Sequence, residues 1–324
     1  MPTFDETIAA PHNEAMRKPR FKRVRPTTPL NITPSMFEVL ELIYQFKALR
    51  SHHIAMHLPH RHDKGLRHSL RLMFDHGLLD KRLCGLYEND TYLLTGKGSD
   101  ALAGRDLPPR FLFLEGGFEV RLGSEFEHSM MTIDLLSNLV AGARAEGARP
   151  ISAEEIFWGA TSMEPFVLPR FTTYRERKTG VKKPYTLIAD GMIGFEYPDQ
   201  KRAFFTIEAE HNKANSRFDD DDPSSRQSST RKKIAHYRDI DWRQVYSNLN
   251  IRNCRVMVAA PTPTQIKNKF QVARSVVKES HLFLGQAVPI VAGADVPILP
   301  GLFNAPWLRI GLPPERINSS TLRG

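Results

Sequence analysis

Three acidic residues near the middle of the chain stand in segments that are otherwise apolar. Asp190 lies in the segment TLIADGMIGFEY, and Glu208 and Glu210 lie in the segment RAFFTIEAEH that follows it. Because successive side chains of a β-strand point to opposite faces, Glu208 and Glu210 project from the same face of a strand. Crowded carboxylates repel one another unless a cation neutralises them. We therefore predict a Mg²⁺ or Mn²⁺ site formed by Asp190, Glu208 and Glu210.

A basic residue on the next helical segment could reach these acids. Lys233, Tyr237 and Ile240 recur at the spacing of one helix face, within the helix predicted over about residues 230–242. A divalent metal held by Asp and Glu activates water and stabilises the charge on a phosphodiester during its cleavage. These residue types therefore favour metal-dependent chemistry on a phosphodiester.

The register of the two strands decides whether Asp190 faces the glutamates. A three-residue turn between the strands places Asp190 opposite Glu208, and a five-residue turn places it opposite Glu210. A four-residue turn places it opposite Ala209, on the wrong face, unless a bulge at Gly191 corrects its direction. The sequence leaves these alternatives open.

The N-terminal third of the chain has helical periodicity followed by two short strands. Thr33 is suited to cap a helix that begins at Pro34. Further helices are predicted over about residues 51–58 and 63–76, and the segments LLDKRL and TYLLT then predict a β-hairpin. Three helices followed by a two-stranded wing form a winged helix-turn-helix, whose third helix enters the DNA major groove. The pattern therefore predicts a DNA-binding domain.

The residues predicted to contact DNA are mostly basic. The outer face of the third helix carries Arg, Lys and His, and both phosphates and base edges favour Arg and Lys. The run RKPRFKRVR lies upstream, and we interpret it as an arm that lies along phosphates or, alternatively, as a solubilising tail. The predicted DNA-binding residues are Arg20, Lys22, Arg23, Arg25, Lys64, Arg67, His68 and Arg71.

Composition agrees with a polyanionic partner and excludes several other classes. The chain has 45 Lys and Arg against 36 Asp and Glu, a net charge of +9. Two cysteines without CxxC spacing exclude a disulfide scaffold and a cysteine-based zinc site. No GxGxxG or GK[ST] motif supports ATP-driven chemistry. The chain shows no secretory signal and no membrane-length apolar stretch, so we expect a cytoplasmic protein without a membrane partner.

Histidines concentrate in the second predicted helix and in the turn that follows it. His53 and His57 are four residues apart, as zinc ligands on a helix can be, but no third ligand accompanies them. We interpret these histidines as polar surface side chains near DNA rather than as metal ligands.

The chain divides into three predicted regions. A basic flexible tail covers 1–31, the winged helix-turn-helix domain covers 32–105, and a second domain covers 111–324. Gly104 and the prolines at 108 and 109 mark the junction between the two domains. The second domain opens with the segment SMMTIDLLSNLVAGARAEG, predicted to be a long amphipathic helix, and continues with strand-like and helical segments. This order predicts an α+β or α/β fold, with a mixed sheet covered by helices.

The acidic residues resemble the motif of the PD-(D/E)XK nuclease superfamily. That superfamily uses an Asp before a strand pair and an E-x-K in the next strand; IADG supplies Asp190, and IEAE supplies Glu208 and Glu210. Glu210 occupies the usual lysine position. Some members carry the lysine on the following helix, and Lys233 matches that position. The resemblance implies catalytic roles for Asp190 and Glu208 as metal ligands, for Glu210 as ligand or water-orienting base, and for Lys233 in stabilising the phosphate charge.

The whole layout resembles the plasmid replication-relaxation family, over about residues 33–312. That family joins an N-terminal winged helix to a PD-(D/E)XK-like domain. Matching pieces occur in the family's order, with an LT-x-KG after the wing, a His in the next domain's first helix, a DG, an acid pair and a K-x-x-x-Y. The residues that carry these pieces are Leu94, Thr95, Lys97, Gly98, His128, Asp190, Gly191, Glu208, Glu210, Lys233 and Tyr237.

The resemblance implies a DNA-binding protein of a mobile element that acts in plasmid replication or mobilisation. Its partners would be DNA and other replication or mobilisation proteins of the same element. Two interpretations of the second domain stay open, a Mg²⁺- or Mn²⁺-dependent DNA nickase or endonuclease and a non-catalytic DNA-binding accessory protein or transcriptional regulator with a degenerate nuclease fold. A third interpretation, a protein-binding adaptor, predicts no salt-sensitive affinity for DNA.

Overall fold

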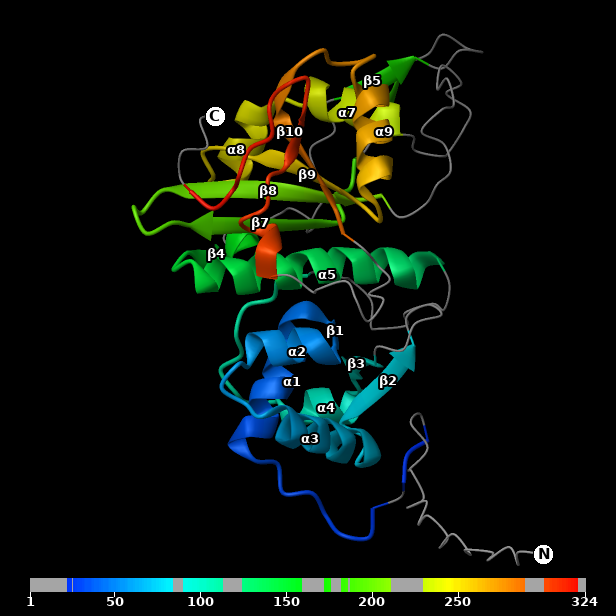
Figure 1. Cartoon of the computed structure of the whole chain (residues 1–324), viewed down its shortest axis with the longest axis vertical. Coiled ribbons are helices and arrows are strands. Elements are labelled where there is room, and N and C mark those ends of the chain that lie inside the picture. The colour runs from blue at the N-terminus through cyan, green and yellow to red at the C-terminus, as the bar shows by residue number, and fades with distance from the viewer. Residues whose placement is uncertain are drawn as a thin grey trace, which may run out of the picture.

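The computed structural model of the 324-residue chain describes residues 22–24, 26–83, 90–112, 124–158, 172–175, 182–185, 187–210, 230–288 and 300–319. Within these residues the protein is a mixed α+β structure. A helical N-terminal region and a six-stranded mixed sheet lie on opposite sides of one long helix, α5 (Figure 1). Within the same residues, no helix is long and apolar enough to cross a membrane.

The N-terminal region combines four helices with a small antiparallel sheet. Thr33 caps the first helix by accepting a hydrogen bond from the Met36 N–H, and Pro34 occupies its first turn, as predicted. The sheet has the strand order β1-β3-β2, and its first strand was not predicted because three residues show no periodicity. The elements are α1 (Pro34–Phe46), β1 (Ala48–Arg50), α2 (Ser51–His57), α3 (Asp63–Asp75), β2 (Leu79–Leu83), β3 (Asp90–Leu94) and α4 (Gly96–Ala101).

Helix α5 (Ser124–Ala145) is buried between the N-terminal region and the large sheet (Figure 1). Every residue from Met130 to Val140 is buried, including polar residues such as Ser137 and Asn138. The prediction of an amphipathic helix is therefore wrong in this central part. The physical reason is that α5 packs on both sides, so its polar residues face protein rather than water.

The large sheet has the strand order β11-β10-β9-β8-β7-β4. Strands β8, β9 and β10 are parallel, and every other neighbouring pair is antiparallel. Its strands are β4 (Arg149–Ile151), β7 (Gly191–Glu196), β8 (Arg202–Ala209), β9 (Arg255–Ala260), β10 (Ser280–Ala287) and β11 (Leu308–Ile310). The remaining elements are α6 (Ala153–Phe157), the hairpin of β5 (Thr172–Arg175) and β6 (Lys182–Tyr185), α7 (Thr230–Asp239), α8 (Trp242–Leu249), α9 (Pro263–Ala273) and the 3-10 turn η1 (Pro300–Leu302).

Strand β8 is buried on both faces. Phe205 and Ile207 belong to a core shared with α5, whereas Phe204 packs in a second core with Ile234 and Tyr237 of α7. The sequence indicated only the first of these faces as core. The face that carries the glutamates is also covered, so its acids lie in an environment of low polarity and need charged or hydrogen-bonding partners.

The helix predicted over about residues 230–242 ends early and is followed by a second helix. Helix α7 ends at Asp239, and the Asp241 side chain accepts hydrogen bonds from the backbone N–H groups of Arg243 and Gln244. Asp241 therefore caps α8, which the sequence analysis did not distinguish from the preceding helix.

A buried ion pair joins the N-terminal region to α5. Arg50 of β1 donates from Nε to Asp134 Oδ1 at 3.1 Å and from Nη2 to Oδ2 at 3.0 Å. The two side chains are only 3% and 7% exposed. The apolar core is continuous across the same contact, because one cluster of buried side chains includes Leu49 and Ile54 together with residues of α5. The predicted boundary between the two domains is therefore bridged by shared apolar packing and by this ion pair.

The histidines of α2 face α5, so their interpretation as surface side chains near DNA is wrong. His53 is buried with Nδ1 at 3.6 Å from Asp134 Oδ1, and His57 Nε2 lies 3.1 Å from Ser137 Oγ. Burial lowers the pKa of His53 well below its usual value and lowers the pKa of His57 to about 3. Both rings are therefore neutral parts of the packing between α2 and α5.

Candidate functional site

The turn that sets the position of Asp190 has three residues, 198–200. The Tyr197 N–H donates to the Lys201 carbonyl and so extends the pairing of β7 and β8 by one residue. Glu196 pairs with Arg202 and Gly191 pairs with Ile207, and continuing this register places Asp190 opposite Glu208. The Asp190 N–H donates to the Ile207 carbonyl at 2.9 Å, and Asp190 Oδ2 accepts a hydrogen bond from the Ala209 N–H at 2.7 Å. Of the three registers left open by the sequence, the structure has the one that brings Asp190 to the glutamates.

Helix α7 brings a cation and a hydroxyl to the same place. Lys233 Nζ lies 2.6 Å from Glu208 Oε2 and 2.9 Å from Glu210 Oε1. One turn later, the Tyr237 hydroxyl donates a hydrogen bond to Glu208 Oε1. The predicted catalytic residues Asp190, Glu208, Glu210 and Lys233 therefore lie together in the structure.

Two further basic residues complete the cluster. His128 of α5 places Nε2 2.9 Å from Asp190 Oδ1. Lys269 of α9 places Nζ 2.9 Å from Glu210 Oε2 and 3.1 Å from Thr230 Oγ1. The sequence analysis named His128 only as part of a family pattern, and it did not identify Lys269. Lys269 is 59 residues from Glu210 along the chain, and no local spacing could have connected them.

We call these six residues, together with Tyr237, the acidic cluster. Its members are Asp190, Glu208, Glu210, His128, Lys233, Lys269 and Tyr237. Three carboxylates thus meet two lysines and one histidine. Each carboxylate has at least one basic partner within 2.9 Å.

The two glutamates have opposite pKa shifts, although both are buried. Burial raises the pKa of Glu208 to about 7, against the lowering effect of Lys233. Burial alone would also raise the pKa of Glu210, but Lys233 and Lys269 outweigh it and lower that pKa to about 2. The fold therefore favours the protonated form of Glu208 and the ionised form of Glu210.

Neighbouring carboxylates favour the charged forms of Lys233 and His128. Burial alone would lower the pKa of Lys233, but Glu208, Glu210 and Asp190 outweigh it and raise that pKa. The hydrogen bond with Asp190 raises the pKa of His128, against the effect of burial. A buried acid with a raised pKa beside an ammonium group is an arrangement found at sites of proton transfer.

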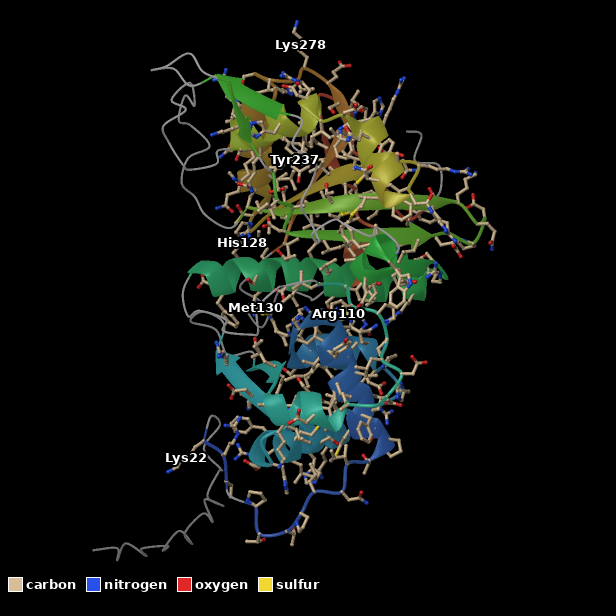
Figure 2. The ribbon with its side chains drawn as sticks, turned by 180° about the vertical axis from the view of Figure 1, so that it is seen from behind. Lys22, Arg110, His128, Met130, Tyr237 and Lys278 are labelled. Atoms are coloured by element: carbon tan, nitrogen blue, oxygen red, sulfur yellow. The ribbon has the colours of Figure 1, made fainter. Side chains whose placement is uncertain are left out.

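One end of the acidic cluster reaches solvent. The side chains of His128 and Asp190 are 36% and 21% exposed, whereas that of Glu208 is 2% exposed. Figure 2 shows His128 on α5 and Tyr237 deeper in the sheet region. A substrate would therefore approach from the side of His128 and Asp190.

Two of the three predicted metal ligands, Glu208 and Glu210, contact the ammonium group of Lys233. Within the described residues, no group of three His, Cys, Asp or Glu side chains has the arrangement of a metal site. The carboxylate oxygens of Glu208 and Glu210 instead point to Lys233. Carboxylate oxygens are the donors that Mg²⁺ and Mn²⁺ prefer, so the chemistry of the donors fits these metals. Their present geometry would have to open around Lys233 to admit one.

The residues predicted to bind DNA fall into two groups. Lys64, Arg67 and His68 are exposed along α3, and Arg67 forms an ion pair with Asp63 one turn away. Arg71 is instead half-buried, pairs with Asp75 at 2.8 Å and donates a hydrogen bond to the Lys22 carbonyl. The first group is therefore available to a ligand, whereas Arg71 holds the incoming chain.

The segment before α1 lies against the C-terminal end of α3. Arg23 Nε donates to the Phe74 carbonyl at 2.9 Å, its Nη2 contacts Leu79 and Asp80, and its guanidinium lies over the Phe74 ring. Lys22 is exposed beside it (Figure 2). Arg20 and Arg25, also predicted to contact DNA, lie outside the described residues.

Comparison of the chain with known protein families, with curated proteins and with solved structures finds no match.

Proposed function

We propose that this chain is a DNA-binding protein of a mobile element, acting in plasmid replication or mobilisation. The observation that carries DNA binding is the exposed face of α3 with Lys64, Arg67 and His68. The order helix, strand, helix, helix and hairpin from α1 to β3 supports the interpretation as a winged helix-turn-helix, in which the third helix would enter the major groove. The charge of +9 adds attraction for phosphates.

The acidic cluster supports a nuclease interpretation of the second region. An acid at the start of one strand, an acid pair on the next and a lysine on the following helix are the parts that the PD-(D/E)XK resemblance requires. All four side chains meet in the structure. When bound, Mg²⁺ or Mn²⁺ would be held by Asp190, Glu208 and Glu210 and would supply activated water. Lys233 would then stabilise the charge on the phosphate.

A second candidate, a non-catalytic DNA-binding regulator, is favoured by one observation. Glu210 occupies the usual lysine position, and two lysines already neutralise it at 2.9 Å. In this interpretation the ion pairs of the acidic cluster stabilise the fold and the region performs no hydrolysis. The two candidates share DNA binding and differ only in metal response and cleavage.

DNA binding is tested first. We expect the affinity for duplex DNA to fall steeply with salt, with a log–log slope that decreases by about 0.9 for each phosphate contact removed. Lys64→Ala and Arg67→Ala should each weaken binding and reduce the slope. Lys278→Ala is the matched control, because Lys278 is exposed at the opposite end of the molecule from Lys22 (Figure 2). Affinity that does not change with salt would contradict the proposal.

Cleavage is tested separately on supercoiled plasmid with Mg²⁺ or Mn²⁺. The nuclease interpretation predicts nicking by the unmodified protein and none by Asp190→Asn or Glu208→Gln, while both variants keep salt-dependent DNA binding. It also predicts that the divalent metal raises the melting temperature of the unmodified protein only. DNA binding without nicking or a thermal response to metal would select the regulator.

A further inference from the structure

A cavity lies at the end of the large sheet that is remote from the acidic cluster. Its volume is about 680 Å³, and it is bordered by the turn between β7 and β8 and by the first residues of β8, β9 and β10. The acidic cluster lies at the other end of β8. The six residue steps from Arg202 to Glu208 place the two sites about 20 Å apart along the strand.

The lining of this cavity is basic. It includes Lys201, Arg202, Arg252, Arg255 and His281, and among the described residues that border it none is Asp or Glu. Arg202 and Lys201 have partners just outside the cavity, in Glu196 at 2.5 Å and Asp199 at 3.1 Å. The other two arginines carry the argument.

Arg255 is a buried guanidinium with one unused donor. Its Nε donates to the His281 carbonyl at 2.7 Å and its Nη2 pairs with Glu315 at 3.0 Å, while its side chain is 10% exposed. Its Nη1 is buried and has no hydrogen-bond partner within the described structure. A buried donor without an acceptor is unfavourable, and it leaves the positive charge of Arg255 beside the cavity incompletely compensated.

The positive charge around Arg255 is incompletely neutralised. Arg309 Nη1 lies 2.8 Å from the same Glu315 oxygen that pairs with Arg255, so two guanidinium groups share one carboxylate. Arg252 is exposed at the cavity and forms no ion pair within the part of the chain that the structure describes. Two arginines without full compensation can bind an anion with several oxygen acceptors.

Size and the remaining lining indicate which anion. The volume lies in the range of cavities that bind small organic ligands. Tyr246 contributes an aromatic ring, and Asn250 and Asn253 contribute amides. Aromatic rings stack on nucleobases, and guanidinium groups bind phosphate oxygens in pairs. We propose that this cavity binds the terminal phosphate of a nucleotide, either as a free nucleotide or at the end of a nucleic acid strand.

The test measures binding to the full chain with probes that differ only in the phosphate. The probes are inorganic phosphate, a nucleoside 5′-monophosphate, the same nucleoside without phosphate, and one short oligonucleotide with either a 5′-phosphate or a 5′-hydroxyl end. We expect the monophosphate to bind more tightly than the nucleoside. Tighter binding of the phosphorylated oligonucleotide would identify the strand end as the source, and binding of the monophosphate alone would identify a free nucleotide.

Variants locate the binding to the cavity. Arg252→Ala changes an exposed side chain and should leave the fold intact, and we expect it to weaken phosphate-dependent binding by about tenfold, equivalent to roughly 1.4 kcal/mol. Arg243→Ala is the matched control, because Arg243 is exposed on α8 and does not line the cavity. Equal binding with and without the phosphate, or equal loss in the two variants, would overturn the proposal.

Discussion

Two buried carboxylates, Asp134 of α5 and Glu208 of β8, differ in their surroundings. The side chains of Asp134 and Glu208 are 7% and 2% exposed, and burial raises their pKa values to about 6 and about 7. Asp134 is held by one arginine in a two-pronged ion pair. Glu208 shares its lysine with Glu210, accepts a hydrogen bond from Tyr237 and adjoins residues that reach solvent.

This difference separates a structural ion pair from a site suited to chemistry. The Arg50–Asp134 pair is closed, because its geometry uses both oxygens and the surrounding residues exclude water. The acidic cluster is open, because Lys233 has two carboxylate partners and Asp190 and His128 are partly exposed. A charged side chain with several partners, such as Lys233, can exchange one partner for a ligand. A single buried ion pair cannot bind a ligand unless the pair is broken.

The largest effect is expected at the closed pair. Arg50→Met leaves Asp134 buried without a cation, and we expect a loss of about 3–5 kcal/mol in the free energy of unfolding at pH 8, measured with urea. The double variant Arg50→Met/Asp134→Leu should recover most of this loss, since it removes the uncompensated charge. A loss below about 1 kcal/mol in the single variant would place this pair among weak surface pairs.

Removing Lys233 should give a smaller loss that depends on pH. Lys233→Met leaves Glu208 without its cation, while Glu210 keeps Lys269. Because the fold raises the pKa of Glu208, protonation of Glu208 stabilises the folded state. This stabilisation is complete at pH values below the ordinary glutamate pKa and is lost as the pH rises through about 7. The difference in unfolding free energy between Lys233→Met and the unmodified protein should therefore be larger at pH 8 than at pH 5, by about 1 kcal/mol. A difference that is constant over this range would contradict the open arrangement.

Tyr237→Phe should have a moderate effect. The Phe ring keeps the packing against Trp242 and Phe283, whose ring centres are each 6.3 Å from that of Tyr237, so the loss reports the hydroxyl. We expect about 1–2 kcal/mol less stability, because a buried carboxyl loses one donor. The measurement is urea unfolding at pH 8, and an unchanged midpoint would mean that the hydroxyl is not needed by Glu208.

The smallest effect on stability is expected at the exposed end of the acidic cluster. The hydrogen bond with Asp190 raises the pKa of His128, so the protonated His128 ring stabilises the folded state. This stabilisation is complete below the ordinary histidine pKa and is lost as the pH rises through the raised pKa. In Asp190→Asn the pKa of His128 should fall, with a stability change under about 1 kcal/mol because the pair is partly exposed. Titration of the histidine resonances by NMR measures this shift. His57, whose pKa is lowered to about 3, serves as the internal contrast.

Local spacing explains which part of the acidic cluster could be predicted. Asp190 and Glu208 adjoin one hairpin, and Lys233 and Tyr237 occupy one face of the next helix, so alternation and helical periodicity were sufficient. Turn length was ambiguous, and only the structure selected the three-residue turn. Lys269 could not be predicted, because its contact with Glu210 depends on how α9 packs against α7.

The closed pair gave no signal in the sequence. Arg50 and Asp134 are 84 residues apart, and neither stands in a motif. The three-residue strand that carries Arg50 is too short for periodicity, and the segment of Asp134 was predicted only as a long amphipathic helix. Both errors arise because the packing of the N-terminal region on α5 depends on contacts between distant residues.

The burial of α5 on both sides limits how the chain can be divided. A truncated protein that begins after residue 112 would keep the large sheet but would expose the side of α5 that carries Asp134 and shares an apolar core with the N-terminal region. An apolar surface of this kind promotes aggregation in a separated fragment. The N-terminal region would in turn lose the acid that neutralises Arg50. Because α5 is buried on both of its sides, we expect neither region to be stable when it is separated from the other.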